Sequence, residues 1–219
     1  MLISHSHKFI TIDIPKTGTR SMRTSLEPLK ILDVIGGPYS TKDNPFAQHG
    51  SATSAKRQFN QNEWNWQEYY KWIIVRNPWD RYFSFFKYFK SYGEKYLKRD
   101  KSINWKPVTI NQGKMCVRLF KNKSTKQAFK SIILAQKSQD TYYMDAQNEI
   151  IVDYIAEFEK LNLEFFRFCD RVGVNTPSLA HGNKSSHHLR SEDVYDQELI
   201  DLVAEKEKSV IKLKGYKFK

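Results

Sequence analysis

The chain has 219 residues, which is enough for one domain with a sizeable apolar core. Hydrophobic residues make up 40% and aromatic residues 14%, a composition that excludes a disordered chain. The 36 Lys and Arg against 24 Asp and Glu leave a net charge of +12, which favours polyanionic partners: nucleic acid, anionic glycans, phosphorylated cofactors or anionic membranes.

The cysteines and the first residues bear on the compartment. Cys116 and Cys169 belong to no CxxC or Cys/His cluster, so the sequence predicts neither a disulfide framework nor a zinc site. The first 16 residues lack the apolar stretch of a signal peptide, and no uninterrupted apolar run is long enough for a membrane span. We therefore expect a soluble cytoplasmic protein.

The first predicted element is a strand over residues 8–14, where Ile alternates with Phe, Thr and Asp. Pro15 ends it, and the chain continues through a turn-like segment into a helix over residues 21–26, which must stop near Pro28. This is a strand, loop and helix in succession.

The next region, residues 35–62, is rich in turn-forming residues and predicts irregular chain with a short helix at 52–59. Residues 72–75 form a compact apolar run, typical of a strand buried on both faces of a parallel sheet. A helix should begin directly afterwards, because Asn77 is a favoured N-cap and Pro78 suits the first helical position.

Residues 91–144 are polar and rich in lysine, and we predict there one helix, 126–136, within an acceptor-specific insertion. A strand at 150–155, a helix at 161–172 and an amphipathic helix at 196–213 complete the chain. The side chains expected to face inward from the helix at 161–172 are Leu163, Phe166, Cys169 and Val172. Strands separated by helices predict an α/β fold with a mostly parallel sheet, in a single domain.

Two segments are candidate anion sites. In the first, residues 14–21, a strand turns into a helix through Gly and hydroxyl residues, which presents backbone N–H groups to an anion, and Lys16 adds a charge. The segment is not a Walker A loop, because the first Gly of that motif is missing. The alternative is an ordinary connection with an exposed lysine.

The second segment is residues 76–86. Arg76 stands at the carboxyl end of a strand, where open α/β sheets bind ligands, and its planar fork suits a phosphate. Ser84 follows in the second turn of the next helix, so its hydroxyl can reach the same phosphate. The alternative is an aromatic core helix on which Arg76 and Ser84 are incidental. For the aromatic residues from Trp79 to Phe89 we favour core packing over a base-stacking platform.

With these segments, IPKTGT at 14–19 and VRNPWDRYFSFF at 75–86, the chain resembles the PAPS-dependent sulfotransferases, PAPS being 3′-phosphoadenosine 5′-phosphosulfate. The branch that the chain resembles most is the carbohydrate type that includes the heparan uronyl 2-O-sulfotransferases. The resemblance extends to EFEKL at 157–161, GNKS at 182–185 and GYKF at 215–218. It implies a P-loop-like three-layer fold, with a central mostly parallel sheet flanked by helices.

The resemblance also implies roles for residues. The early loop would hold the 5′-phosphosulfate, with the Lys16 ammonium beside the bridging oxygen, and Arg76 with Ser84 would hold the 3′-phosphate of PAPS or of its product PAP. A late loop would close over the cofactor, and no metal is needed. The expected cofactor-binding residues are Lys16, Thr17, Gly18, Thr19, Arg20, Ser21, Arg76, Ser84, Lys184 and Ser185. Arg20 replaces the family's small residue or Thr, and either adds a phosphate contact or points outward.

The acceptor hydroxyl must lose its proton, and a His is the expected base. His49 lies between the two anion segments, where this branch tends to carry a His before a small-residue helix start. The alternative is a solvated loop His. The competing histidines are His5, His7, His181, His187 and His188.

The expected function is therefore transfer of a sulfuryl group from PAPS to an acceptor hydroxyl. The resemblance favours a carbohydrate acceptor, for which a basic surface would suit an anionic glycan, and not nucleic acid. Two other functions stay open. A P-loop nucleotide or sugar kinase would need Mg²⁺ ligands and a full Walker A loop, and a non-catalytic polyanion-binding protein would depend on the net charge alone.

Overall fold

The computed structural model describes residues 1–179 and 190–218. These residues form two compact units. The first unit comprises Met1–Asn77 with residues 138–179, and the second comprises Pro78–Lys137 with residues 190–218. The expectation of a single domain with an insertion at 91–144 stays a prediction.

The first unit contains a five-stranded sheet of order β3-β1-β2-β4-β5. The strands are β1 (Leu2–Ser4), β2 (Phe9–Ile12), β3 (Val34–Ile35), β4 (Tyr70–Val75) and β5 (Tyr154–Glu157). β2 pairs parallel with β4 and β4 pairs parallel with β5, whereas β1 pairs antiparallel with both of its neighbours. Four of the five strands therefore run in one direction. The predicted α/β fold with a mostly parallel sheet is confirmed.

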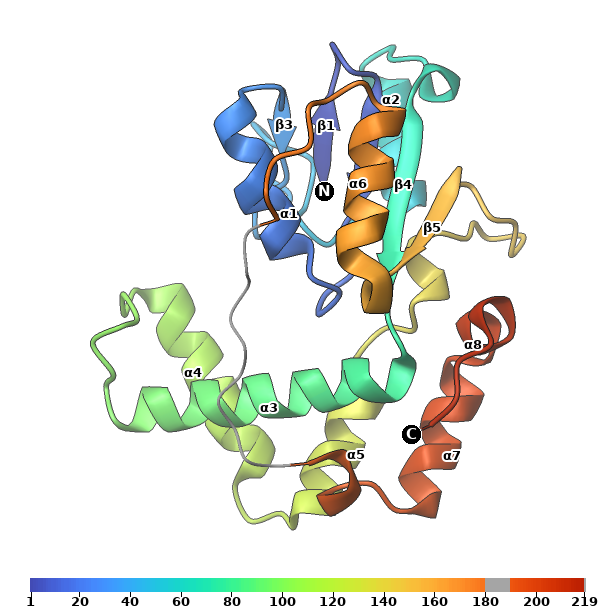
Figure 1. The fold of residues 1–219 in the computed structure, drawn as a ribbon. Helices are drawn as coiled ribbons and strands as arrows, with labels where there is room; N and C mark the ends of the chain where they lie inside the picture. The colour runs from blue at the N-terminus through green and yellow to red at the C-terminus, as the bar shows by residue number, and fades with distance from the viewer. Residues whose placement is uncertain (180–189, 219) are drawn as a thin grey trace. The chain divides into compact units, whose positions relative to one another are not determined.

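Helices flank this sheet (Figure 1). They are α1 (Thr19–Leu26), α2 (Ala52–Gln61) and α6 (Leu161–Arg171). α1 and α6 cover one face, where Met22 and Phe168 join one apolar cluster with Trp72 of β4. α2 lies behind the sheet in Figure 1, and its Phe59 packs against Tyr69 with ring centroids 4.9 Å apart.

The prediction for α6 was right about the helix and about two of its four inward residues, since Cys169 and Val172 are buried, but wrong about Leu163 and Phe166. Leu163 and Phe166 are 46% and 56% exposed, while Phe165 and Phe168 are buried against the sheet. Positions 165, 168, 169 and 172 follow the helical i, i+3, i+4, i+7 spacing, whereas residues taken every third position drift around the helix.

The second unit is entirely helical in its regular structure. Its α-helices are α3 (Pro78–Leu97), α4 (Pro107–Phe120), α5 (Thr125–Ala135), α7 (Gln197–Lys206) and α8 (Lys208–Lys214). Buried aromatic side chains from Trp79 to Phe89 pack with Phe129 of α5 and Leu199 of α7 in one apolar cluster. Core packing of the aromatic run is thus confirmed.

Other boundaries differ from the predictions. The helix predicted at 126–136 is confirmed as α5, but it is not the only helix within 91–144, because α3 continues to Leu97 and α4 was missed. α4 buries only Gly113 and Cys116 completely, so it carries no clear apolar stripe. The short strands β1 and β3 were also missed, because two or three residues cannot display a period.

Two further elements were displaced or divided. The strand predicted at 150–155 is β5, Tyr154–Glu157, because Ile150 forms a bridge with Met144 instead of joining the sheet. The helix expected over 196–213 is two helices, α7 and α8, separated by Glu207, whose side chain is completely buried in an ion pair with Arg81.

Candidate anion-binding site

The two predicted anion segments meet at one edge of the sheet. β2 and β4 are adjacent parallel strands, with Ile12 opposite Ile73, so their carboxyl ends lie side by side. The loop that carries Lys16 follows β2, and Arg76 follows β4 directly. This is the edge at which open α/β sheets bind ligands.

The loop after β2 has a strained backbone conformation. Lys16 has φ 72° and Gly18 has φ 79°, both in the left-handed region. A Cβ at Gly18 would lie 2.8 Å from the ring of Phe158, so only glycine fits there. The buried Thr17 hydroxyl donates to the Ile14 carbonyl at 2.9 Å and closes the turn. Thr17 can therefore offer an anion its backbone N–H, while its hydroxyl proton is engaged within the loop.

Helix α1 begins at Thr19, directly after Gly18, and has no acidic residue in its first turn. The first backbone N–H groups of a helix point toward the chain that precedes it, and here no side chain caps them, although the Ser21 N–H donates to the Gly18 carbonyl at 3.0 Å. The side chains of Thr19 and Ser21 are nearly buried, and Arg20 is exposed. The exposure of Arg20 matches the outward alternative.

The Arg76 side chain joins the two segments. One guanidinium nitrogen, Nη1, donates to the Lys16 carbonyl at 3.1 Å. The guanidinium carbon also lies 4.4 Å from the centre of the Phe158 ring, within the range of a cation–π contact. The ring of Phe158 thus supports both Gly18 and Arg76. The sequence pattern placed Phe158 in a family-like segment but indicated no such role.

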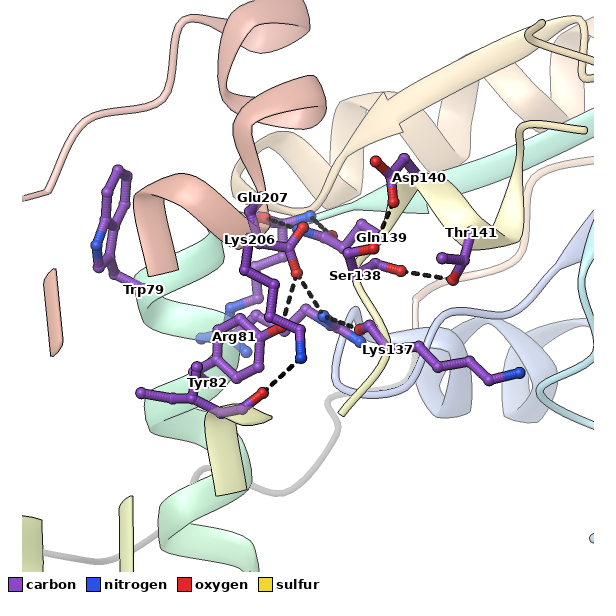
Figure 2. Close-up of polar contacts among 12 residues, drawn as sticks. Trp79, Arg81, Tyr82, Lys137, Ser138, Gln139, Asp140, Thr141, Lys206 and Glu207 are labelled. Atoms are coloured by element: carbon purple, nitrogen blue, oxygen red, sulfur yellow. Dashed lines mark hydrogen bonds and ion pairs between the residues drawn. The ribbon is translucent and has the colours of Figure 1, made fainter. Parts of the chain in front are cut away.

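The backbone of Arg76 is held by Gln139, which sequence reasoning missed. Gln139 Oε1 accepts from the Arg76 N–H and Gln139 Nε2 donates to the Arg76 carbonyl, both at 2.9 Å. Gln139 is completely buried and lies in a turn where Ser138 donates to Asp140 and Thr141 donates to Ser138 (Figure 2). A single Gln after a polar stretch carries no signal of this pairing.

The next peptide is held by Glu159, whose Oε1 accepts from the Asn77 N–H at 2.7 Å. Glu159 follows Phe158, so the segment after β5 contacts both residues that leave β4. Three side chains distant in sequence therefore position the end of β4.

His49 is bound to the same edge of the sheet. Its Nδ1 lies 2.8 Å from the carbonyl oxygen of Asp13, the residue that follows β2. A carbonyl only accepts, so Nδ1 carries the proton and, in the neutral ring, Nε2 holds the lone pair. His49 is exposed as a whole, but partial desolvation of its ring lowers its pKa below the usual value, while the bond to Asp13 opposes that shift. His49 is therefore neutral and fit to accept a proton near pH 7.

The other candidates are placed elsewhere or not described. His5 and His7 lie in the turn between β1 and β2, at the amino end of β2, where they bond to Tyr69 and Val172. Ser84 is half-buried in α3 of the second unit. The predicted late-loop residues Lys184 and Ser185 lie outside the described residues, as do His181, His187 and His188.

Two kinds of feature are absent from the described residues. Residues 1–179 and 190–218 contain no group of three or more His, Cys, Asp or Glu side chains arranged to hold a metal ion. Within the same residues, no helix combines the length and apolar character needed to cross a membrane.

Comparison with known proteins identifies the class. The sequence model of the sulfotransferase family matches residues 1–175, so the chain belongs to the sulfotransferase family. A transferase that acts on a hydroxyl-bearing acceptor is the activity this membership supports. No curated protein matches the chain. Among solved structures, a sulfotransferase from Alicyclobacillus acidocaldarius is similar, with 12% identity, a TM-score of 0.40 and 96% of each chain covered.

Proposed function

We propose that this chain transfers the sulfuryl group of PAPS to a carbohydrate hydroxyl, as in the uronyl 2-O-sulfotransferase branch. The observation that supports this proposal most directly is the hydrogen bond from Arg76 to the Lys16 carbonyl. It brings the two predicted phosphate-binding segments together at the carboxyl ends of β2 and β4.

The residues present suit an anionic nucleotide. Uncapped N–H groups at the start of α1, the Lys16 ammonium and the Arg76 guanidinium are the donors that phosphate and sulfate esters prefer. PAPS would supply the transferable sulfuryl group. We propose that Thr17, Gly18 and Ser21 orient the 5′ end, and that Arg76 and Ser84 bind the 3′-phosphate. The remaining proposed contacts come from Thr19, Lys184 and Ser185.

Lys16 and His49 would share the chemistry. Negative charge grows on the oxygen that leaves the sulfur, and an ammonium fixed at that oxygen lowers the barrier. The acceptor hydroxyl loses its proton as its oxygen attacks, and His49 Nε2 accepts that proton. Because His49 Nδ1 is engaged in a hydrogen bond to the Asp13 carbonyl, Nε2 is the ring nitrogen available to the acceptor hydroxyl.

Replacing Arg76 tests the 3′-phosphate assignment. Wild-type protein should bind PAP much more tightly than AMP, which lacks the 3′-phosphate, when both are titrated calorimetrically. Arg76→Ala should weaken PAP binding by about tenfold to a hundredfold, the loss expected for a charge-assisted hydrogen bond pair. AMP binding should change little.

A matched control is Arg23→Ala, since Arg23 on α1 donates to the Gly36 carbonyl and is no proposed ligand. Its discrimination between PAP and AMP should equal that of the wild type. Equal affinity of wild-type protein for PAP and AMP would contradict the assignment.

His49 should show itself in the pH dependence of transfer. Because partial desolvation lowers the His49 pKa, the basic form persists below the ordinary value of about 6.5, and activity should fall only at more acidic pH. His49→Ala should remove nearly all transfer and abolish this acidic limb, while PAP affinity stays at the wild-type value. An active His49→Ala variant with an unchanged pH profile would assign the base elsewhere.

A further inference from the structure

The net charge of the protein is concentrated in one segment. Residues 78–137 contain 15 Lys and Arg but only three Asp and Glu, which leaves +12, the net charge of the whole chain. The remaining 159 residues are neutral overall. Most of this excess lies between residues 87 and 123, with 11 basic and two acidic side chains. The charge is therefore a property of α3, α4 and the loop between them.

Neighbouring acids do not neutralise this region. Lys126 and Lys130 of α5 form ion pairs with Asp196 and Glu198, and Arg81 pairs with Glu207. The cations between Lys95 and Arg118 form no ion pair with residues 1–179 or 190–218. Their field is thus directed to solvent, where it attracts anions.

Aromatic side chains accompany these cations. Tyr88, Tyr92 and Tyr96 are spaced four apart on α3 and share one helical face. Trp105, from the loop after α3, lies with its ring centre 6.1 Å from Tyr92 and 5.6 Å from Tyr96. The Arg99 guanidinium covers Tyr96 at 4.6 Å and Trp105 at 6.0 Å. Cation and rings therefore form one surface.

Helix α4 holds these rings in place. A Cβ at Gly113 would lie 2.4 Å from the Tyr96 ring, so the absent side chain lets that ring lie against α4. Gln112 Nε2 donates to the Tyr88 hydroxyl at 2.8 Å. Tyr88 is nevertheless 36% exposed, and Tyr92, Tyr96 and Trp105 are partly exposed. The rings are ordered while part of each is open to a ligand.

We infer that this basic aromatic surface, formed by Tyr88, Tyr92, Lys95, Tyr96, Arg99 and Trp105, binds the chain of an anionic glycan. A pyranose ring offers an apolar face to an aromatic side chain and hydroxyls to Tyr, Gln and Arg, and its carboxylates pair with Lys and Arg. The inference rests on the proposed function, since it names the acceptor class of the same enzyme.

The ring geometry favours a glycan over nucleic acid. Successive bases stack on separate, open aromatic faces. Here the rings contact one another, at 40° between Tyr88 and Tyr92 and at 69° and 71° to Trp105. The polar groups at their edges, such as the Tyr88 hydroxyl, also differ from the continuous apolar face that enters a membrane.

The test is calorimetric titration of the full chain with an unsulfated uronic acid–glucosamine octasaccharide. Lys95→Ser combined with Arg99→Ser should weaken binding by about tenfold, at roughly 0.7 kcal/mol for each of the two charges. Tyr88→Ala should weaken it by a further severalfold, and added salt should reduce wild-type affinity. PAP affinity, measured on the same samples, should not change.

The matched control removes the same charge from exposed positions of α8, Lys208→Ser with Lys212→Ser, and should bind the octasaccharide like the wild type. An equal loss in the control would overturn the inference. Tighter binding of single-stranded DNA or of anionic lipid vesicles, with the same sensitivity to the Lys95 and Arg99 changes, would also overturn it. Failure of the wild-type protein to bind PAP would refute the proposed function instead.

Discussion

Lys16→Ala should lower turnover about a hundredfold to a thousandfold, the range measured when one fixed charge-stabilising donor is removed. PAP binding should weaken only severalfold, because Gly18, Arg76 and the N-terminus of α1 still contact the nucleotide in our proposal. The physical reason is that the ammonium acts on charge that appears during transfer. Steady-state rates with PAPS and a hydroxyl acceptor, together with PAP titration, separate the two effects.

The backbone at Lys16 makes this variant a fair test. Its φ of 72° is equally demanding for Lys and Ala, so the substitution adds little strain to the loop. Lys8→Ala is the control, because Lys8 also has positive φ but its ammonium forms an exposed ion pair with Glu68. Lys8→Ala should retain full turnover. Normal turnover by Lys16→Ala would remove Lys16 from catalysis.

Glu207→Ala should destabilise the second unit by about 3–5 kcal/mol, the cost of leaving one charge of a buried pair without its partner. Glu207 and Arg81 are completely buried, with Oε1 and Nη1 3.0 Å apart (Figure 2). The Tyr82 hydroxyl donates to the same oxygen at 3.0 Å, and Arg81 also donates to the Lys137 carbonyl. Burial and then the Glu207 charge raise the pKa of Tyr82.

The control lies two residues away. Glu205 is an exposed side chain that pairs with Lys208, so Glu205→Ala should change stability by less than about 0.5 kcal/mol. Urea unfolding followed by tryptophan fluorescence measures both variants. If Glu207→Ala were as stable as Glu205→Ala, the buried pair would contribute nothing to the fold.

Local sequence determined much of the fold. The alternation at 8–14 and the apolar run at 72–75 led to β2 and β4, and Asn77-Pro78 marked the start of α3. Gly18 stands where a left-handed turn is needed, so its loop could also be recognised. These features follow from periods and turn chemistry that act over a few residues.

Other features depended on contacts between distant residues. The partners of Arg76 are Gln139 and Phe158, 63 and 82 positions away, and neither carries a motif that indicates this role. The sheet that α6 covers likewise decided which side chains of that helix are exposed. The burial of Glu207 beside Arg81 decided that α7 and α8 are separate helices.

For the site, the sequence alone therefore determined which residues carry charge and which loop can bind an anion. The tertiary structure decided that Arg76 lies at the Lys16 carbonyl and that the Asp13 carbonyl accepts a hydrogen bond from His49 Nδ1, which fixes the ring proton on that nitrogen. The physical reason is that these bonds form only when β2, β4 and the chain before α2 close on one another. Local periodicity does not encode that closure.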